Sequence, residues 1–392
     1  MSSPLTPSSP LLAHGAPFPT LLQAHMASTA KTYVIASASI AKNTAHLDAL
    51  KDALGARRLA GLRVGMRPHT FWSEVLEVAD DARRVGADCI VTLGAGSLTD
   101  AAKIAAYAIA NSATTPSGLN SLLTPTAKEP SQIPVICIPT TLSGGEFSSS
   151  AGGTNDANGQ KCTFSGTSCP RVVILDPELA TTTPARVWLS TGVRALDHCV
   201  ETLCSLHSNA AADATVSRGL RRLVPALLQC KADPTDTAAR LQCFLGARDA
   251  MVAATSGVPM GASHGIGHQL GPAGVGHGET SCILNPAVCK YNYAKKANVA
   301  RQDAVVALLW EDDHAAAVFE DRGLKRDATD LGDLMDAIIR ALGMPRTLKE
   351  FGIGEDKLDG IAEHSLQDRM VKTNPAHLDK EGVLEILRMV LG

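Results

Sequence analysis

The chain has 392 residues and a formal net charge of −3, with 45% apolar and 19% charged side chains. A chain of this length is usually too long to fold around one hydrophobic core, so the length predicts a globular protein of two domains. Lysines and arginines are scattered, which gives no basis for a nucleic-acid-binding face. No apolar run approaches the roughly 18 residues that a membrane span needs. Neither nucleic acid nor a membrane is therefore an expected partner.

The first 30 residues are rich in serine and proline. They contain no cationic start followed by a long apolar stretch, so they do not resemble a secretory signal, and they lack the arginines of a transit peptide. We predict a flexible or extended arm over residues 1–30. Ten dispersed cysteines with no CxxC pair indicate reduced thiols, and hence a cytoplasmic protein.

Residues 31–188 alternate short apolar runs with helical stretches. Uniformly apolar strands that alternate with helices are typical of a parallel sheet covered on both faces. We therefore predict a Rossmann-like α/β domain here, able to bind a dinucleotide. Its expected strands are 32–39, 89–97, 133–141 and 171–177, and its expected helices are 40–54, 73–87 and 101–111.

The pattern changes to long amphipathic helices after residue 188. Stretches such as ARLQCFLGARDAMVAA repeat apolar residues with a helical period. We predict an all-α domain over residues 189–392, with the domain boundary near residue 188.

Two glycine-rich turns follow expected strands of the first domain. GAGS (94–97) lies where a strand ends and a helix begins, and PTTLSGGEF (139–147) follows the next strand. Small residues let a backbone approach a pyrophosphate, and a helix N-terminus offers unpaired N–H groups. The spacing is not GxGxxG. The pair of turns predicts a dinucleotide site, and tight connections without a ligand are the alternative.

Histidines gather in the second domain. His264 and His268 are four residues apart on one helix face, and His277 follows across a glycine-rich loop. Arg194 and His198 share one face of an earlier helix. Such a group of imidazoles can hold a metal, transfer protons or polarise a carbonyl.

These motifs together resemble the iron-containing alcohol dehydrogenase superfamily, and within it maleylacetate reductase. The resemblance rests on LGAGSLTDAAK (93–103), IPTTLSGGE (138–146) and HGIGHQLG (264–271), with GMRPHT (65–70) and a late Asn-Pro in the expected order. It implies a dehydroquinate synthase-like fold, NAD or NADP as cofactor, a small-molecule substrate and a homodimer.

The resemblance also assigns individual residues. It implies that the pyrophosphate is contacted by the first glycine-rich turn, through Gly94, Gly96, Ser97 and Asp100. It implies that the adenosine and ribose are contacted by the second turn, through Thr140, Thr141 and Leu142. It also implies that Lys161 lies near the nicotinamide and that His268 relays protons.

The metal position departs from the metal-dependent members. His198, His264 and His277 match three of their four ligands, but Arg194 stands where they carry aspartate. A guanidinium stays protonated and offers no lone pair, so it would repel a divalent cation. Maleylacetate reductases lack that aspartate too. We predict no catalytic metal, with the three histidines as the ligands if one is bound. Asp197 is an alternative fourth ligand, but on an ideal helix it is turned about 100° from His198. We therefore expect it in a helix-surface ion pair with Arg194.

Two further departures concern specificity. Leu142 stands where maleylacetate reductases carry tyrosine, so the substrate need not be maleylacetate. Ser37 stands where many NAD-specific members place an aspartate at a strand end, and without that carboxylate NADP(H) is also acceptable.

The predicted reaction is hydride transfer from NAD(P)H to a carbonyl or conjugated alkene of a small acidic substrate. Arg194 would stabilise the developing oxyanion or hold a substrate carboxylate, and His268 or His264 would donate the proton. His198 and His277 would shape the anion pocket. The alternatives are a non-redox lyase, cyclase or isomerase on the same fold, a metal-dependent alcohol dehydrogenase, and a non-catalytic dinucleotide-binding protein.

Overall fold

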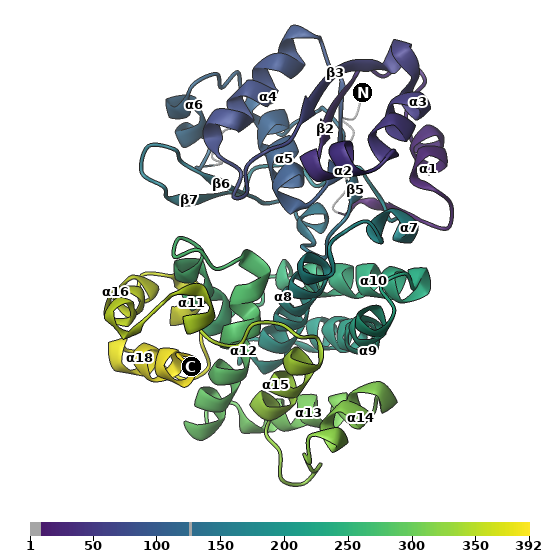
Figure 1. Ribbon diagram of the computed structural model, residues 1–392. Coiled ribbons are helices and arrows are strands. Elements are labelled where there is room, and N and C mark those ends of the chain that lie inside the picture. Colours follow the sequence, from purple (N-terminus) through teal and green to yellow (C-terminus); the bar gives the residue numbers. More distant parts are fainter. Residues whose placement is uncertain (1–8, 125–127) are drawn as a thin grey trace. The chain divides into compact units, whose positions relative to one another are not determined.

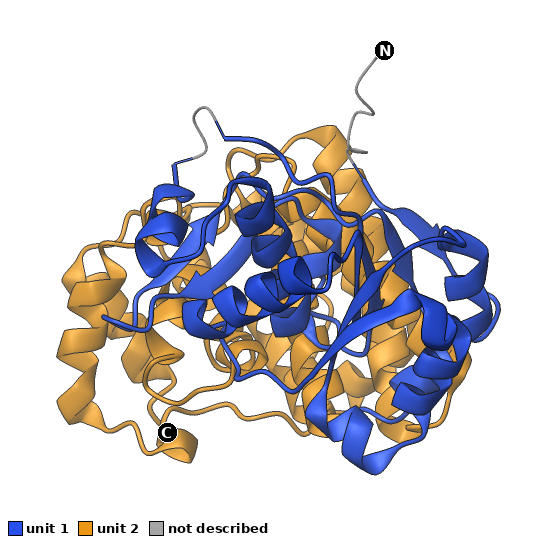
Figure 2. Ribbon diagram, turned by 90° about the horizontal axis from the view of Figure 1, so that it is seen from above, with its two compact units in different colours: residues 1–183 blue, residues 184–392 orange. Residues whose placement is uncertain are grey.

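The computed structural model describes residues 9–124 and 128–392 (Figure 1). The chain divides into two compact units, the first ending at Thr183 and the second running from Pro184 to Gly392 (Figure 2). The boundary expected near residue 188 is wrong by a few residues, because it falls inside helix α8, Ala185–Cys204. Pro184 is the N-cap of that helix, and the fixed φ of proline suits a helix start.

Unit 1 contains a six-stranded, wholly parallel sheet in the order β1-β8-β5-β4-β2-β3. Its strands are β1 Leu11–Ala13, β2 Thr32–Ala36, β3 Leu59–Val64, β4 Cys89–Gly94, β5 Val135–Pro139 and β8 Val172–Ile174. The four expected strands correspond to β2, β4, β5 and β8, and the predicted parallel sheet is confirmed.

The central strands are buried along their whole length. Alternate side chains of a strand point to opposite faces, so burial of every residue requires helices on both sides. Val34 packs in one cluster with Phe18 of α1, Phe18–His25, and Leu50 of α3, His46–Arg58. The neighbouring Tyr33 hydroxyl lies 3.3 Å from Asp81 of α4, Trp72–Arg84, which covers the opposite face.

The arm expected over residues 1–30 is wrong where the structure describes it, from residue 9 onward. Strand β1 pairs in parallel with β8, and α1 buries Phe18 and Leu22 against the sheet. The backbone N–H of Phe18 donates to Asp176 at 2.8 Å. Serine and proline suggested an unfolded segment, but tertiary pairing decides the structure of this three-residue strand. Residues 1–8 of the expected arm lie outside the described residues.

The rest of unit 1 completes the connections between strands. Its helices are α2 Ala38–Asn43, α5 Gly96–Ala110, α6 Pro116–Ser121, α7 Pro177–Ala180 and the 3₁₀ turn η1 Gly145–Phe147. A separate antiparallel hairpin joins β6, Ala151–Thr154, to β7, Lys161–Phe164. The hairpin packs on α5 and places its residues beside the turn that follows β4.

Unit 2, described in full, consists of helices and loops with no strand, as predicted. Helix α8 packs against α9, α10 and α12. The other helices are α9 Ala210–Ala232, α10 Thr237–Ala254, α11 Ala262–Leu270, α12 His277–Ala294, α13 Val299–Leu309, α14 Asp313–Asp321, α15 Leu331–Ala341, η2 Lys349–Phe351, α16 Glu355–Ser365, α17 Arg369–Lys372 and α18 Lys380–Met389.

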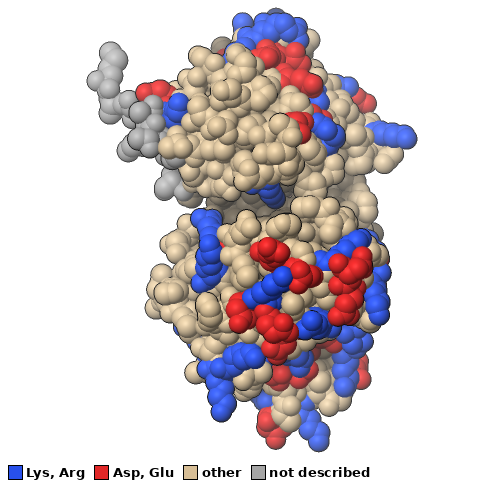
Figure 3. Space-filling view, turned by 90° about the vertical axis from the view of Figure 1, so that its left-hand side faces the viewer, with Lys and Arg blue, Asp and Glu red and all other residues tan. Residues whose placement is uncertain are grey.

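The ten cysteines, all within the described residues, are free thiols, and eight of them are buried. Among the described helices, none is both long and apolar enough to cross a membrane. On the face seen in Figure 3, acidic and basic side chains are intermixed.

Candidate active site

The turn between β4 and α5 in unit 1 offers backbone N–H groups that can bind an anion. Helix α5 has 15 residues, and its N-cap, Ala95, has no side chain that can satisfy the first backbone N–H groups. Unpaired N–H groups at a helix N-terminus bind phosphate together with the positive end of the helix dipole. The turn therefore fits the pyrophosphate of a dinucleotide.

Close packing explains the two glycines of this turn. Gly94 has φ 152°, and a Cβ atom on it would lie 2.9 Å from Leu98 Cδ2 and 3.0 Å from Ser37 Cβ. A Cβ atom on Gly96 would lie 3.0 Å from Ser143 Cβ. Both loops and the end of β2 thus meet here, and a side chain at either glycine would push them apart.

The strand order reverses at the same point. After β2 the chain runs outward to β3, and it then returns to the other side of β2 with β4 and β5. Ligands of open parallel sheets bind where connections diverge in this way, beyond the carboxyl ends of the strands. The Ser37 N–H donates to Leu93 O at 2.9 Å, and the Thr140 N–H donates to Gly94 O at 3.2 Å. Three residues that the sequence singled out therefore lie at adjacent strand ends.

The remaining expected cofactor residues surround this turn. Ser97 is the second residue of α5, and Thr141 Oγ1 lies 3.1 Å from Ser143 Oγ. Leu142 is buried. Asp100 accepts from the Gly152 N–H of β6 at 3.1 Å, on the hairpin that also carries Lys161.

A buried lysine fixes the second turn. Lys103 has a fully buried side chain, lies 3.3 Å from Asp100 Oδ1, and donates to the backbone oxygens of Gly145, Ser148 and Ser150. Glu146 is buried close by, and burial raises its pKa to about 7 although Lys103 opposes the shift. The sequence drew no attention to Glu146.

Arg194 of α8 is the buried cation of the candidate site in unit 2. It is 4% exposed, and its Nη1 donates to Thr280 Oγ1 at 3.3 Å and to Ser281 Oγ at 3.1 Å, both on α12. Burial lowers the pKa of this guanidinium, whereas the carboxylates of Asp197 and Glu201 act in the opposite sense. A guanidinium remains charged under such conditions. The site therefore carries a fixed positive charge.

Two histidines stack beside this charge. The rings of His198 and His264 have centroids 4.6 Å apart and planes 28° apart. The pKa of His198 lies well below its ordinary value because of burial, and also because of His264 and Arg194. Burial and then the charge of Arg194 lower the pKa of His264 in the same way. Burial and the charge of Arg194 thus both favour the neutral form of the two imidazoles.

Two buried carboxylates hold His264. Its Nδ1 lies 2.7 Å from Glu201 Oε2 and 3.3 Å from Asp197 Oδ2. Burial raises the pKa of Glu201 to about 7 against the effect of hydrogen bonds from the Gly261 and Ser263 N–H groups. The sequence analysis did not select Glu201, although it lies seven residues after Arg194 on the same helix.

The helix-surface ion pair expected for Asp197 is wrong. Asp197 is fully buried between α8, α11 and α12, where it accepts hydrogen bonds from Ser263, Ser281 and Asn285 at 2.6–2.7 Å. Its position three residues after Arg194 suggested a pair on one surface, but this part of α8 is surrounded by other helices. The carboxylate instead accepts from the same Ser281 hydroxyl that accepts from Arg194.

The other two expected histidines lie in different surroundings. His268 is partly exposed, and its Nδ1 lies 2.8 Å from Asp368 Oδ2. Burial raises the pKa of Asp368, but the hydrogen bonds from His268 and from the Met370 N–H outweigh it, so the pKa lies below its usual value. His277 is the exposed first residue of α12.

Two buried carboxylates and an imidazole form a possible metal-binding group in unit 2. In the described part of the chain, one group of three potential ligands has its atoms within 4.8 Å, namely Asp197, Glu201 and His264. His264 Nδ1 lies 2.7 Å from Glu201 Oε2, and the hydroxyls of Ser263 and Ser281 donate to Asp197 Oδ2. His198, His264 and His277, the expected fallback ligands, do not form such a group among the described residues.

Two family descriptions match this chain. They are "Iron-containing alcohol dehydrogenase" over residues 18–177 and "Fe-containing alcohol dehydrogenase family, C-terminal" over residues 188–391. The chain belongs to the iron-containing alcohol dehydrogenase family. This family member is an oxidoreductase, which confirms the sequence-based recognition and the prediction of an enzyme.

Individual proteins support the assignment. The family member is 41% identical to Dehydrogenase ALT3 of Alternaria alternata over 382 residues, 91% of this chain and 98% of that protein. It is 31% identical to Maleylacetate reductase of Burkholderia cepacia over 347 residues, 86% of each chain. The crystal structure of Maleylacetate reductase from Agrobacterium tumefaciens matches 100% of this chain and 99% of that chain, with TM-score 0.76 and 25% identity. The predicted fold class is thereby confirmed.

Proposed function

We propose that this oxidoreductase reduces a carbonyl, or an alkene conjugated with one, in a small acidic substrate, with NADH or NADPH as the hydride donor. The observation that carries the proposal is Arg194, a buried cation at the position where metal-dependent members carry an aspartate ligand. It lies next to two neutral histidines, so an anionic substrate group gains a charge partner without competition from a second cation.

In this proposal unit 1 holds the cofactor. The α5 N-terminus with Gly94, Gly96 and Ser97 binds the pyrophosphate, and Ser37, Thr140 and Thr141 border the adenosine ribose. Asp100, Leu142 and Lys161 complete the binding residues. The dinucleotide supplies the hydride, and every other role falls to side chains of the protein. A relative named NAD-dependent methanol dehydrogenase, from Bacillus methanolicus and 26% identical, supports a nicotinamide cofactor.

In unit 2, Arg194 stabilises the negative charge that develops on the substrate oxygen, or it clamps a carboxylate through its planar fork. His268, oriented by Asp368, donates the proton, and His198, His264 and His277 shape the pocket. Relatives named for maleylacetate and for 4-hydroxybutyrate, both carboxylates, support an acidic substrate.

Arg194 is also the reason for proposing that catalysis needs no metal. Purified protein should contain no stoichiometric transition metal, and a chelator should leave turnover unchanged in an assay that follows oxidation of the reduced nicotinamide. Stoichiometric iron or zinc, together with loss of turnover on chelation and recovery on metal addition, would show a metal-dependent dehydrogenase instead. Turnover of the substrate with no net change in nicotinamide absorbance would show a non-redox enzyme.

A further inference from the structure

Helix α11, which carries His264 and His268, has few features that would stabilise it on its own. It has nine residues, two of them glycines, and its N-cap is Gly261, which has no side chain to accept from the first N–H groups. An isolated helix shorter than about 12–15 residues is marginal in water, and glycine inside a helix is less favourable than alanine. The helix therefore depends on the elements packed around it.

Segment 368–376, which includes α17 and the late Asn-Pro pair, runs along α11 in the opposite direction. Three contacts join the two, and each is three residues further along the segment and three residues further back along the helix. They pair Asp368 with His268, Val371 with Gly265, and Asn374 with Ala262. A single register therefore relates the segment to the helix, and a shift at one contact affects the other two.

The first two of these contacts are close. Asp368 Oδ2 lies 2.8 Å from His268 Nδ1, in the last turn of the helix. A Cβ atom on Gly265, in the middle of the helix, would lie 2.6 Å from Val371 Cγ2 and 2.8 Å from the backbone nitrogen of Val371. A side chain at Gly265 would thus push the segment away from α11. The glycine that weakens the helix is also what lets the segment approach it.

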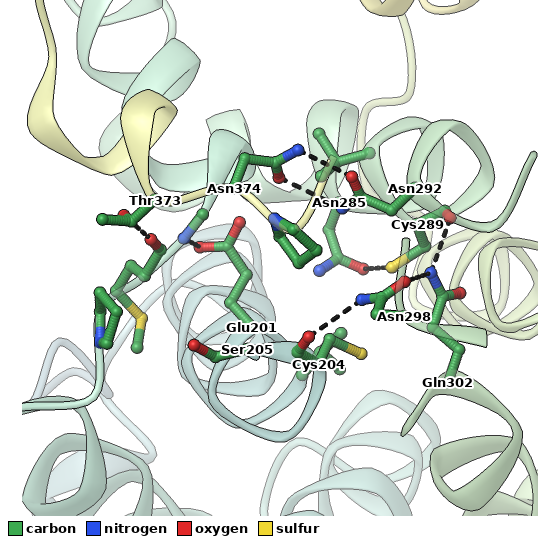
Figure 4. Close-up of a pocket in the computed structure, with 16 residues that line it drawn as sticks. Glu201, Cys204, Ser205, Asn285, Cys289, Asn292, Asn298, Gln302, Thr373 and Asn374 are labelled. Atoms are coloured by element: carbon green, nitrogen blue, oxygen red, sulfur yellow. Dashed lines mark hydrogen bonds between the residues drawn. The ribbon is translucent and has the colours of Figure 1, made fainter. Parts of the chain in front are cut away.

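Asn374 makes the third contact, at the start of α11. Its Oδ1 accepts from the Ala262 N–H and from Asn292 Nδ2 of α12, both at 3.2 Å. Its Nδ2 donates to Asn292 Oδ1 at 2.7 Å and to the Ala376 oxygen at 2.8 Å. Figure 4 shows the two paired amides beside the small cavity that they line. Because the amide uses both donors and both acceptor sites, its orientation is determined, and aspartate, which only accepts, could not replace it.

We propose that Asn374 is a positioning residue, which fixes the register of segment 368–376 on α11 and so holds the Asp368 carboxylate against His268. The inference rests on the proposed function, in which His268 donates the proton. Asn374 acts through Asp368, six residues earlier in the same segment. A displacement of about 1 Å caused by a change far from the chemistry can cost about 10²-fold in rate. Removal of the Asn374 amide should therefore lower turnover and leave cofactor binding by unit 1 unaltered.

The contact between Asp368 and His268 can be followed by NMR without substrate or turnover. The full-length protein, labelled with ¹⁵N in its histidine rings, gives ring ¹H–¹⁵N correlations, and a His268→Gln variant identifies the signal of His268. Asp368→Asn shows where that signal lies without the carboxylate partner. We expect Asn374→Ala to move the His268 signal toward its position in Asp368→Asn. An unchanged His268 signal in folded Asn374→Ala would overturn the proposal.

Kinetics in two backgrounds separate positioning from a general loss of stability. Asn374→Ala should lower kcat about 10- to 100-fold in the wild-type background but less than about twofold in the Asp368→Asn background, because both changes disturb the same contact. The dissociation constant of NADPH should stay within about twofold throughout. Equal falls in kcat in the two backgrounds would mean that the two residues act independently, and the proposal would then be wrong.

Asn298→Ala is the matched control. Asn298 is a buried asparagine of the same unit, but its amide bonds to the Cys204 oxygen and to Gln302 instead of α11. This variant should leave the His268 signal and kcat as in the wild type. A His268 shift as large as that of Asn374→Ala would show a general effect of a lost buried amide and contradict the proposal.

Gly265→Ala tests the same register from the side of α11, should Asn374→Ala fail to fold. Its added methyl group pushes Val371 away, whereas alanine favours the helix itself. It should therefore shift the His268 signal in the same direction as Asp368→Asn, and an unchanged signal would refute the common register. The NMR measurements need no turnover, so they decide the role of Asn374 even if the protein reduces no acidic substrate. The two proposals can thus fail separately.

Discussion

Arg194 Nη1 lies 3.1 Å from Ser281 Oγ, and that hydroxyl donates its own hydrogen to Asp197 at 2.6 Å. The guanidinium is therefore held in place by a hydroxyl, while the buried carboxylate acts on it through that hydroxyl. A direct ion pair would neutralise much of the positive charge. The indirect link orients the side chain and leaves its field available to an anionic ligand.

Arg194→Ala should lower kcat by about 10²–10³, the usual effect of losing one preorganised oxyanion donor. The dissociation constant of the dinucleotide should change little, because the proposed cofactor residues all belong to unit 1. Steady-state kinetics and a fluorescence titration with NADPH test both statements. Arg218→Ala, which removes an exposed arginine of α9 that pairs with Asp249, is the control. Near-normal turnover in Arg194→Ala would refute the proposed role.

Asp368→Asn should lower kcat about 10- to 100-fold while the fold is retained. Asp368 is the N-cap of α17 and accepts from the Met370 N–H, a role that asparagine fills equally well. Its second oxygen, however, orients His268, and a charged hydrogen bond of this kind contributes about 1.5–3 kcal/mol. Asp312→Asn makes the same change at the N-cap of α14 and should leave kcat unaltered. Equal kinetics of the two variants would argue against His268 as proton donor.

Ser37→Asp should weaken NADPH binding at least about tenfold and leave NADH binding nearly unchanged. Ser37 lies at the carboxyl end of β2, next to Gly94, where a carboxylate repels a ribose 2′-phosphate and accepts from a 2′-hydroxyl. Titration with both dinucleotides measures the change. Ser117→Asp, at an exposed position of α6, adds the same charge elsewhere and should affect neither. The same loss for both cofactors would mean that Ser37 does not border the 2′ position.

Glu146→Gln should make the stability of the protein less dependent on pH. The pKa of Glu146 is raised from 4.5 to about 7, so folding favours its neutral form. Its contribution is fully present below pH 4.5 and is lost as the pH rises through 7, which amounts to about 3 kcal/mol. Urea unfolding at pH 4.5 and at pH 8 should show the variant gaining on the wild type at the higher pH. A constant difference would contradict the raised pKa.

Phe18→Ala should destabilise unit 1 by about 3–5 kcal/mol, the usual cost of truncating a buried aromatic side chain. Phe18 is 1% exposed and packs in the cluster that covers one face of the sheet. Thr20→Ala, at an exposed position of the same helix, should change stability by less than about 0.5 kcal/mol. Thermal unfolding of the two variants tests whether this segment belongs to the core. Equal melting temperatures of the two variants would indicate that this segment is not packed into the core of unit 1.

The sequence predicted those strands and helices whose pattern is evident within a short stretch of residues. Long apolar runs such as residues 89–94 are buried on both faces, and their composition alone distinguishes them from solvent-exposed strands. It missed β1 and β3, because both lie at the edges of the sheet. β1 has three residues, and β3 alternates partly buried with exposed positions, so neither shows a strong pattern.

The same limit applies to the candidate site. The glycines of the turns and the histidines of the second domain could be selected from the sequence, because few structural roles require these residue types at the spacing seen here. Asp197 and Glu201 look like ordinary surface residues of an amphipathic helix. They are buried because α12 packs against α8 and because residues of α11 hydrogen-bond to both carboxylates. Asp368 lies 100 residues from His268, a separation at which no local rule predicts contact.

The pairing of β1 with β8 sets an order of events during synthesis. Leu11 cannot pair with Val172 until some 160 further residues have left the ribosome. The hydrogen bond between Phe18 and Asp176 is subject to the same delay. The first strand of unit 1 is therefore without its partner strand until nearly all of unit 1 has been synthesised. Ribosome-bound chains that stop short of β8 should expose that segment to chaperones and proteases, and chains that extend past it should not.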